Sequence, residues 1–277
     1  MTRLVLLLCW VATVTAFEPI QQRYHDNVGV PLAEAIRQAE LSTDFDGSRI
    51  VGGSPAALGD YPYMGGLLML LDDGRTSIGG STLISNTKVL TAAHNLFDGF
   101  NRAREVTVVL GSVHIFSGGT RITSNVFELH SGFDIRTINN DIAIITISWV
   151  NYNNVIRNIA LATGSNTYAG SWAWAAGFGK TSDLGSASPD LLHARLQVIT
   201  NAACRDVFGS LFVIDSTLCV SGANRINTCI GDSGGPLVAD NHLIGVTSFS
   251  SGRGCEANLP SGFARVSAFN SWIRARM

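Results

Sequence analysis

Short runs of strand-forming residues, separated by glycine and other turn residues, most strongly limit the folds open to this chain. The sequence has 277 residues, of which 29 are glycine and 46% are hydrophobic, so a large core can form. Many short strands at this spacing are typical of antiparallel barrels and sandwiches, which gives an all-β fold class. We expect strands at 77–84, 87–92, 106–111, 120–129, 142–147, 171–176, 194–198, 217–220, 236–238, 243–249 and 262–266.

The first 16 residues have the pattern of a secretory signal peptide. Arg3 precedes an apolar run at 4–14, and small residues at 14–16 offer a cleavage site. A membrane anchor is the alternative, but the run is shorter than the roughly 20 apolar residues that span a bilayer. No later segment is apolar over such a length. The net charge is −2, so the chain lacks the excess of basic residues that nucleic-acid binding would need. We therefore expect a secreted protein that binds neither membranes nor nucleic acid.

Residues 17–49 differ in composition from the remainder of the chain, with six acidic residues and no cysteine. A short helix is expected at 31–41, because the range begins with proline and places Leu32, Ile36 and Ala39 on one inward face. By itself this composition is also compatible with an ordinary N-terminal extension.

A serine near the C-terminal end lies in the run GDSGGP at 231–236, whose glycines permit a sharp turn that exposes the hydroxyl. The N–H groups of Gly231 and Ser233 are then placed to bind a developing oxyanion. A hydroxyl attacks well only when a base takes its proton and a third group orients that base. His94 and Asp141 are the candidates for these two roles.

Four motifs together resemble the signatures of chymotrypsin-like serine endopeptidases: IVGG at 50–53, TAAH at 91–94, NDIA at 140–143 and GDSGGP at 231–236. Because all four occur in the family's order, the resemblance is specific, and it runs from about residue 50 to the C-terminus. It implies two six-stranded antiparallel β-barrels, about 50–160 and 161–265, followed by a terminal α-helix. A helix at 266–277 is also expected from the sequence itself, because the spacing of Val266, Phe269 and Ile273 places these three apolar residues on one helical face.

The resemblance also implies the mechanism. His94 would act as the base and Asp141 would orient it, both from the first barrel, while Ser233 from the second barrel would attack a peptide carbonyl to form an acyl-enzyme. Gly231 and Ser233 would supply the oxyanion hole. The family needs no cofactor for this reaction, and no metal ligand set is evident in the sequence.

Activation by proteolysis is a further implication. Residues 17–49 would be an activation propeptide that a trypsin-like protease cuts after Arg49. In the family, the ammonium group created at Ile50 inserts beside the aspartate before the nucleophile, here Asp232. A buried carboxylate needs such a partner, and losing one partner costs about 3–5 kcal/mol, so insertion can shape the turn around Gly231.

The expected substrate pocket follows from motif positions. Asn227 would form its base, with Ser250 and Ser261 on its walls, and the run Ser248, Phe249 and Ser250 would pair with the substrate backbone. Trypsin-like members carry an aspartate at the base, and Asn227 lacks that charge, so burying a cationic side chain there would be costly. We therefore expect cleavage after uncharged aromatic or large aliphatic residues.

Four cysteines remain once the signal peptide is removed, and the sequence alone allows three pairings. The resemblance implies Cys204–Cys219 and Cys229–Cys255. Zinc binding is the alternative, but the sequence has no CxxC pair.

The family usually carries another disulfide beside the catalytic histidine. Here Asn95 follows the histidine, and the surroundings of 79–81 hold no cysteine. We expect packing to hold His94, with weaker local rigidity.

Other functions fit the sequence less well. The run at 231–235 also matches the G-x-S-x-G nucleophile elbow of α/β-hydrolases, but that fold needs an acid and then a histidine after the serine, and only His242 follows. An inactive binding homologue would usually lack a triad residue. A regulatory cascade protease would often carry a cysteine-rich module upstream.

The basic residues point to the setting in which the enzyme works. After Arg49 the chain has 13 arginines and only two lysines, Lys88 and Lys180. Arginine keeps its charge to higher pH than lysine, so this surface suits an alkaline medium, and the profile resembles the digestive proteases of insect midguts. We expect a monomer secreted into a gut lumen, with protein or peptide substrates and protein protease inhibitors as partners.

Overall fold

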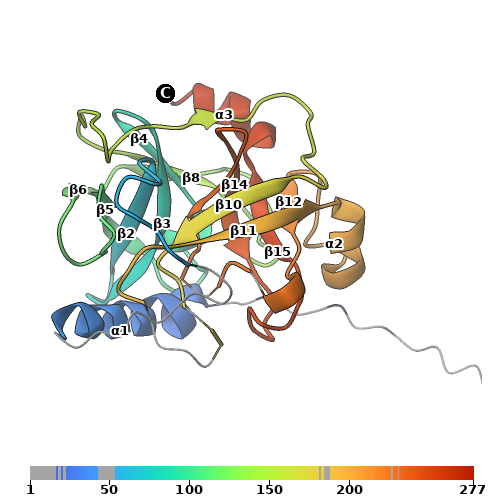
Figure 1. Ribbon diagram of the computed structural model, residues 1–277, viewed down its shortest axis with the longest axis horizontal. Helices are drawn as coiled ribbons and strands as arrows, with labels where there is room; N and C mark the ends of the chain where they lie inside the picture. The colour runs from blue at the N-terminus through green and yellow to red at the C-terminus, as the bar shows by residue number, and fades with distance from the viewer. Residues whose placement is uncertain are drawn as a thin grey trace, which may run out of the picture.

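The computed structural model describes residues 17, 20, 23–42, 54–180, 182–183, 188–225, 227–229 and 231–277. Two curved antiparallel sheets lie side by side, and helix α1 (Val30–Leu41) runs across one end of the first (Figure 1). The expected signal peptide, Arg49 and Ile50 lie outside the described residues. No helix within the described ranges is long and apolar enough to cross a membrane.

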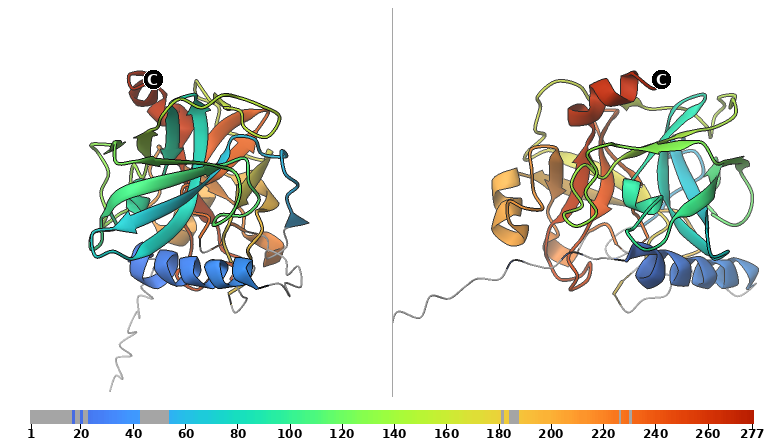
Figure 2. Two further views of the ribbon diagram at one scale, coloured as in Figure 1. Left: turned by 90° about the vertical axis from the view of Figure 1, so that its left-hand side faces the viewer. Right: turned by 180° about the vertical axis from the view of Figure 1, so that it is seen from behind.

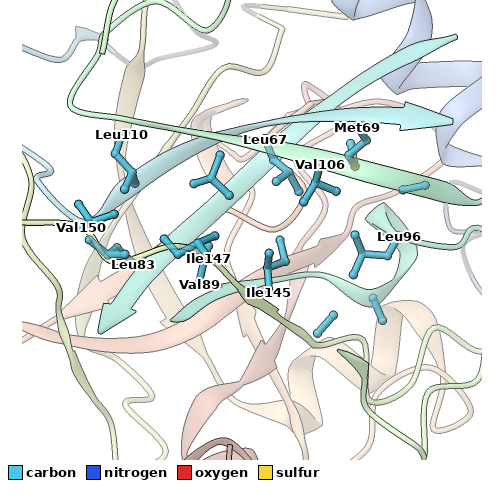
Figure 3. Packing of buried hydrophobic residues seen from close by; sticks show 14 of the residues in the cluster. Leu67, Met69, Leu83, Val89, Leu96, Val106, Leu110, Ile145, Ile147 and Val150 are labelled. Carbon is cyan, nitrogen blue, oxygen red and sulfur yellow. The ribbon is translucent and has the colours of Figure 1, made fainter. Parts of the chain in front are cut away.

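The first sheet has seven strands in the order β6-β5-β2-β3-β4-β8-β7. Their bounds are β2 Met64–Leu71, β3 Thr76–Ser85, β4 Lys88–Thr91, β5 Ala103–Leu110, β6 Thr120–Ser124, β7 Phe127–Leu129 and β8 Ala143–Thr146. The sheet curls into an open half-barrel around a dense apolar core, in which Leu67, Met69 and Leu83 are fully buried (Figure 3). This core fixes the ends of β4 and β8, where two of the candidate catalytic residues lie.

The second sheet closes on itself. Its strands are β10 Trp172–Gly177, β11 Leu192–Ile199, β12 Thr217–Val220, β13 Pro236–Ala239, β14 His242–Phe249 and β15 Ser261–Arg265, and the short strands β1 Ser54–Pro55 and β9 Ala160–Leu161 pair with β11 and β14. The order β11-β10-β13-β14-β15-β12 forms a closed six-stranded barrel because β11 also pairs with β12.

The all-β class and the antiparallel barrels are confirmed, with the first barrel open rather than closed. The expected strand at 120–129 is divided into β6 and β7, and β2 was not predicted at all. Strand β2 pairs with β3 on one side and β5 on the other, and it is buried along nearly its whole length, so it lacks the alternation of a half-exposed strand.

Helices cover the ends of the sheets. The turn η1 (His25–Gly29) leads into α1, while α2 (Asn201–Phe208), which was not predicted, lies beside the second sheet. The C-terminal segment is a 3-10 turn, η4 (Val266–Phe269), followed by α3 (Asn270–Arg274), and not one continuous helix. Its three expected apolar residues are nevertheless buried, as the predicted face requires.

Helix α1 lies against the underside of the first sheet (Figure 2). Leu32, Ala33 and Ile36 are buried, whereas Ala39 is only partly covered. Gly29 permits the close approach, because a Cβ at this position would lie 1.9 Å from Oγ of Ser77 on β3. The helix predicted from the apolar spacing therefore exists and begins one residue earlier than expected.

Candidate active site

His94 and Asp141 meet although they follow different strands of the first sheet. His94 lies on the turn η2 (Ala93–Asn95) after β4, and Asp141 lies just before β8. The Nδ1 atom of His94 is 2.7 Å from Oδ2 of Asp141, and the His94 backbone N–H donates to Oδ1 at 2.9 Å. Both side chains are buried. An ionised carboxylate in this place holds a hydrogen on Nδ1 and leaves Nε2 free to accept a proton.

Ser248 on β14 adds a third donor to this carboxylate, with its Oγ 2.6 Å from Oδ2 of Asp141. The hydrogen bond links the second sheet to the buried pair of the first. The sequence assigned Ser248 only to substrate binding, because the motif around it gives no sign of which side chain its hydroxyl contacts.

Ser233 lies in a turn that requires glycine. Gly231 and Gly234 have φ values of 106° and 85°, in the region that other residues rarely adopt. A Cβ at Gly234 would also lie 2.3 Å from both the Gly80 carbonyl oxygen and Oγ1 of Thr91. The turn therefore has no room for a side chain at Gly234, and Ser233 beside it is half-buried.

The backbone carbonyl of Ser233 is held from the first sheet. It accepts a hydrogen bond from the Gly80 N–H at 2.7 Å and a second from Nδ2 of Asn95 at 2.9 Å. Asn95 also donates to Oγ1 of Thr91 at 3.0 Å and is fully buried. The sequence identified Asn95 only by the missing cysteine, and the structure adds a hydrogen-bonded link between the residue after the histidine and the nucleophile's own backbone.

Two of the candidate catalytic residues open onto one cavity of about 330 Å³. His94 and Ser233 both line it, together with Ser248, Phe249 and Ser250 at the C-terminal end of β14. The structure thus brings together three segments that lie far apart in the sequence.

The other expected pocket residues lie deeper. Asn227 is buried, donates from Nδ2 to the Leu259 carbonyl oxygen at 2.9 Å, and accepts from the Thr228 N–H at 3.0 Å. Ser261 is fully buried as well. Among the described residues that line the cavity, Ser250 is present and Asn227 and Ser261 are not.

Asp232 is buried beside the nucleophile. Its carboxylate accepts hydrogen bonds from the Gly179 N–H at 2.9 Å and the Cys229 N–H at 2.8 Å. Burial raises the pKa of this carboxyl to about 6, and the two backbone donors partly oppose the rise.

Two disulfides join Cys204 to Cys219 and Cys229 to Cys255, the pairs that the resemblance implies. Asp183, Cys229 and Cys255 are the one group in the described part of the chain with metal-ligand spacing, but both sulfurs are in the disulfide and cannot bind a metal as thiolates.

Tyr24, from the N-terminal segment, reaches the same cavity and was not predicted. Its ring packs edge-on against the ring of His94 with centroids 4.8 Å apart, and its hydroxyl donates to the Ile78 carbonyl oxygen at 2.8 Å. Burial raises the pKa of the Tyr24 phenol, and a hydrogen bond with the Ser233 side chain partly offsets this rise. Leu32 of α1 packs against Gly231, where a Cβ would lie 2.1 Å from its Cδ2.

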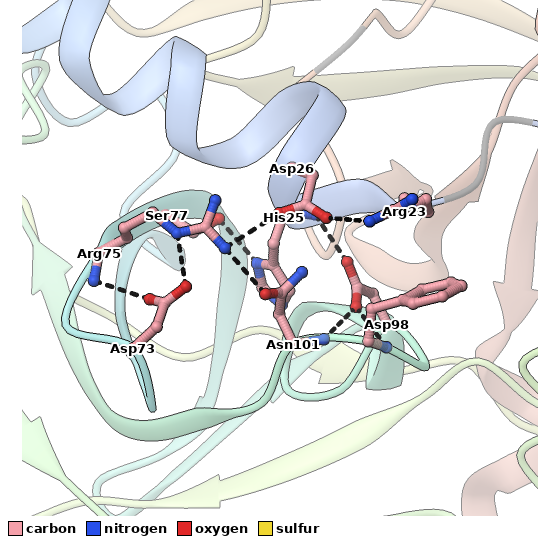
Figure 4. Close-up of polar contacts among 9 residues, drawn as sticks. Arg23, His25, Asp26, Asp73, Arg75, Ser77, Asp98 and Asn101 are labelled. Carbon is pink, nitrogen blue, oxygen red and sulfur yellow. Dashed lines mark hydrogen bonds and ion pairs between the residues drawn. The ribbon is translucent and has the colours of Figure 1, made fainter.

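His25 is the neighbour of Tyr24 and lies at the centre of a polar cluster (Figure 4). Its Nδ1 is 2.8 Å from Oγ of Ser77, and its backbone N–H donates to Oδ2 of Asp98 at 2.9 Å. Asp26 forms ion pairs with Arg75 and with Arg23, both at 3.0 Å. Burial lowers the pKa of His25 to about 4.

Comparison with known proteins agrees with this geometry. Residues 50–273 match the trypsin family. The chain is 37% identical over 231 residues to the collagenase of Hypoderma lineatum, which covers 82% of this chain and 86% of that one. It is 38% identical over 240 residues to trypsin, alkaline A, of Manduca sexta, which covers 82% and 90%.

A solved structure, described as HL collagenase, superposes with a TM-score of 0.77 at 36% identity and covers 82% of this chain and 98% of that one. A curved double sheet of this kind, with a buried histidine–aspartate pair facing a glycine-bracketed serine, is the architecture of a serine endopeptidase, a hydrolase of peptide bonds. Within that class the chain belongs to the trypsin family.

Proposed function

We propose that this chain is a secreted endopeptidase, made as an inactive precursor, which cuts proteins after uncharged aromatic or large aliphatic residues. The observation that carries the proposal is that His94, doubly hydrogen-bonded to Asp141, lines one cavity with Ser233.

The reaction follows from these three residues. His94 takes the Ser233 proton on Nε2 as the oxygen attacks the peptide carbonyl, and Asp141 stabilises the charged imidazole. The N–H groups of Gly231 and Ser233 bind the oxyanion. His94 then protonates the leaving amine, and water repeats the sequence on the acyl-enzyme.

Asn227 is the basis for the choice of substrate. Its side-chain amide is held by the Leu259 carbonyl and the Thr228 N–H, so the proposed pocket base is polar but uncharged. A buried arginine or lysine side chain would find no counter-ion there. Small residues at Ser250 and Ser261 leave room for a large side chain in the mature enzyme.

The same pocket implies an outside activator. An enzyme that disfavours arginine should cut poorly after Arg49, so a trypsin-like protease would perform that cut. Residues 17–49 would then be the propeptide, and residues 1–16 the signal peptide that directs secretion. The new ammonium at Ile50 would pair with Asp232, whose raised pKa reflects burial without a cationic partner among the described residues.

A digestive role in an insect gut lumen fits the relatives and the composition. Collagenase and alkaline trypsin are the names of similar insect proteins. A surface with 13 arginines and two lysines after Arg49 keeps its charge at high pH. Protein protease inhibitors are the expected regulatory partners of a monomer in that setting.

Two measurements on the activated enzyme test the proposal. Ser233→Ala should abolish peptide hydrolysis and labelling by a fluorophosphonate, and retained hydrolysis would refute the assigned nucleophile. A panel of peptides that differ only before the cleaved bond should give the highest kcat/KM for Phe, Tyr or Leu. Highest values for Arg or Lys would refute the proposed specificity.

A further inference from the structure

The N-terminal segment follows the catalytic cavity from one side to the other. At one end Ile20 forms an antiparallel bridge with Ser251, directly after the run proposed to pair with substrate. In the middle Tyr24 packs against His94 and lines the cavity together with Ser233. At the other end α1 packs under the first sheet (Figure 2). The segment therefore covers the space that a peptide substrate needs.

We propose that residues 20–42 bind a dedicated surface of the enzyme and remain there after the activating cut, as a noncovalent inhibitor that must leave before substrate can enter. This inference rests on the proposed function, since it assigns a regulatory ligand to the same active site.

Most of the polar contacts of the segment are made with the first sheet and its turns. We call this surface the docking surface and define it as Arg75, Ser77, Ile78, Asp98, Ile115 and Phe116. Apolar contact is made by Leu32 and Ile36 of α1, which share a buried cluster with Ile78 and Ile115.

The far end of the helix is fixed by one carboxylate. Oε1 of Glu40 accepts the N–H groups of Ile115 and Phe116, both at 2.9 Å, and Oε2 accepts the Ser117 hydroxyl at 2.8 Å. Hydrogen bonds to an ionised group are stronger than those between neutral groups. All three donors come from residues 115–117 of the enzyme, so the Glu40 carboxylate fixes the C-terminal end of α1 on that surface.

The cut itself leaves these contacts in place. The bond between Arg49 and Ile50 lies outside residues 20–42, and each of these contacts joins the segment to residues beyond position 50. The docking surface lies on the first sheet and its turns, whereas the expected rearrangement on activation centres on Asp232, next to the second. Leu32 also packs against Gly231 beside Asp232, so this contact can change on activation while those of the docking surface stay. Residues 17–49 contain no cysteine, so the cut segment is held only by noncovalent contacts and can dissociate.

Tyr24 is the group that blocks the reaction. Its ring packs edge-on against the ring of His94, and Tyr24 lines the same cavity as Ser233. A substrate carbonyl can approach Ser233 only when this ring has moved away. The cut chain with the segment still bound is therefore inactive even if its oxyanion hole is complete.

The test uses the full-length precursor after cleavage by a trypsin-like protease. Turnover and fluorophosphonate labelling are measured at once, after dilution, and after the segment has been removed by size exclusion. We expect activity per cut chain to rise by about tenfold or more on separation, since dissociation follows mass action. Adding the synthetic peptide 20–42 back should inhibit again. Full activity immediately after the cut, insensitive to added peptide, would overturn the inference.

Substitutions within the segment provide matched controls, because the mature enzyme is the same molecule in every case. The peptide with Glu40→Gln should inhibit about tenfold more weakly, because one charged acceptor is lost. The peptide with Glu34→Gln loses a carboxylate on the exposed face of the same helix and should inhibit as the wild type does. Equal inhibition by all three would refute the docking geometry.

Binding of the peptide and turnover of substrate are then measured separately. Anisotropy of a fluorescent 20–42 peptide reports docking on the cut chain even when that chain is inactive. Peptide that binds an enzyme unable to turn over substrate or label would refute the proposed function alone. Active enzyme that fails to bind the peptide would refute the inference alone.

Discussion

Acidification should release the N-terminal segment from the enzyme, because His25 becomes protonated. His25 is fully buried in the docked state, and its Nε2 has no hydrogen-bond partner among the described residues. Its pKa falls from 6.5 to about 4, chiefly through burial. His94 and Arg75 lower this pKa further, while Asp98 and Asp26 oppose the fall. The neutral ring is thus the form that docks.

The sign and size follow from the two pKa values. A histidine whose pKa is lower when docked favours docking fully above pH 6.5 and loses that contribution as the pH falls from 6.5 toward 4. Between pH 7 and pH 5 the dissociation constant of the segment should rise about 20-fold, or ~1.8 kcal/mol, by proton linkage. At alkaline pH the docking should be at its strongest and independent of pH.

The assay is peptide binding to the Ser233→Ala enzyme, which cannot digest the peptide. Wild-type 20–42 is compared with the His25→Gln peptide from pH 8 to pH 5, each followed by fluorescence anisotropy. The enzyme is the same in both titrations, so its own groups contribute equally to the two binding curves. The affinity ratio should change about 20-fold, because only the wild-type peptide carries the linked proton. Parallel pH profiles for the two peptides would refute the role of His25.

Three further predictions concern the enzyme itself. Asn95→Asp keeps the side-chain shape but removes the hydrogen-bond donor to the Ser233 carbonyl. We expect kcat to fall about tenfold and the free energy of unfolding to fall by ~1–3 kcal/mol. An unchanged kcat would contradict the link to Ser233. Asn227→Asp should raise kcat/KM for Arg substrates relative to Phe substrates. The gain should be limited, since the new carboxylate faces the Leu259 carbonyl oxygen. An unchanged ratio of the two kcat/KM values would show that Asn227 does not form the base of the pocket. Asp232, with a pKa raised from 3.8 to about 6, favours the folded precursor below pH 3.8 and loses this contribution as the pH rises through 6. Urea unfolding of the precursor should therefore show Asp232→Asn gaining about 2.4 kcal/mol on the wild type between pH 4 and pH 7. A difference that stays constant with pH would be the contrary result.

The sequence predicted the site where local chemistry sets the structure. The glycines around Ser233 are required by positive φ and by a contact at Gly234 that leaves no room for a Cβ, and both demands are visible in the motif. His94 and Asp141 were found because each lies beside a strand end within a recognisable run. The helix at 30–41 was found because its apolar residues recur with helical spacing.

Other features depend on residues far apart in the chain. Tyr24 is a single aromatic residue in a polar stretch, and nothing near it indicates that its ring would meet His94, 70 positions later. Asn95 could be recognised as a departure from the family, but its hydrogen bond to the Ser233 carbonyl joins residues 138 positions apart. The open first barrel reflects which outer strands pair, and strand propensity does not determine that.

Under the proposed function, two barriers of different kind separate the precursor from the active enzyme. The first concerns Asp232, a buried carboxylate with a raised pKa, and only the charge created by cutting before Ile50 would relieve it. The second concerns Tyr24, which fills the reaction space and is held by contacts that the cut does not touch. Because the first is chemical and the second steric, neither event can substitute for the other. A protease of this design would be released in full only where its propeptide is diluted or digested, a condition that the proposed gut lumen would provide.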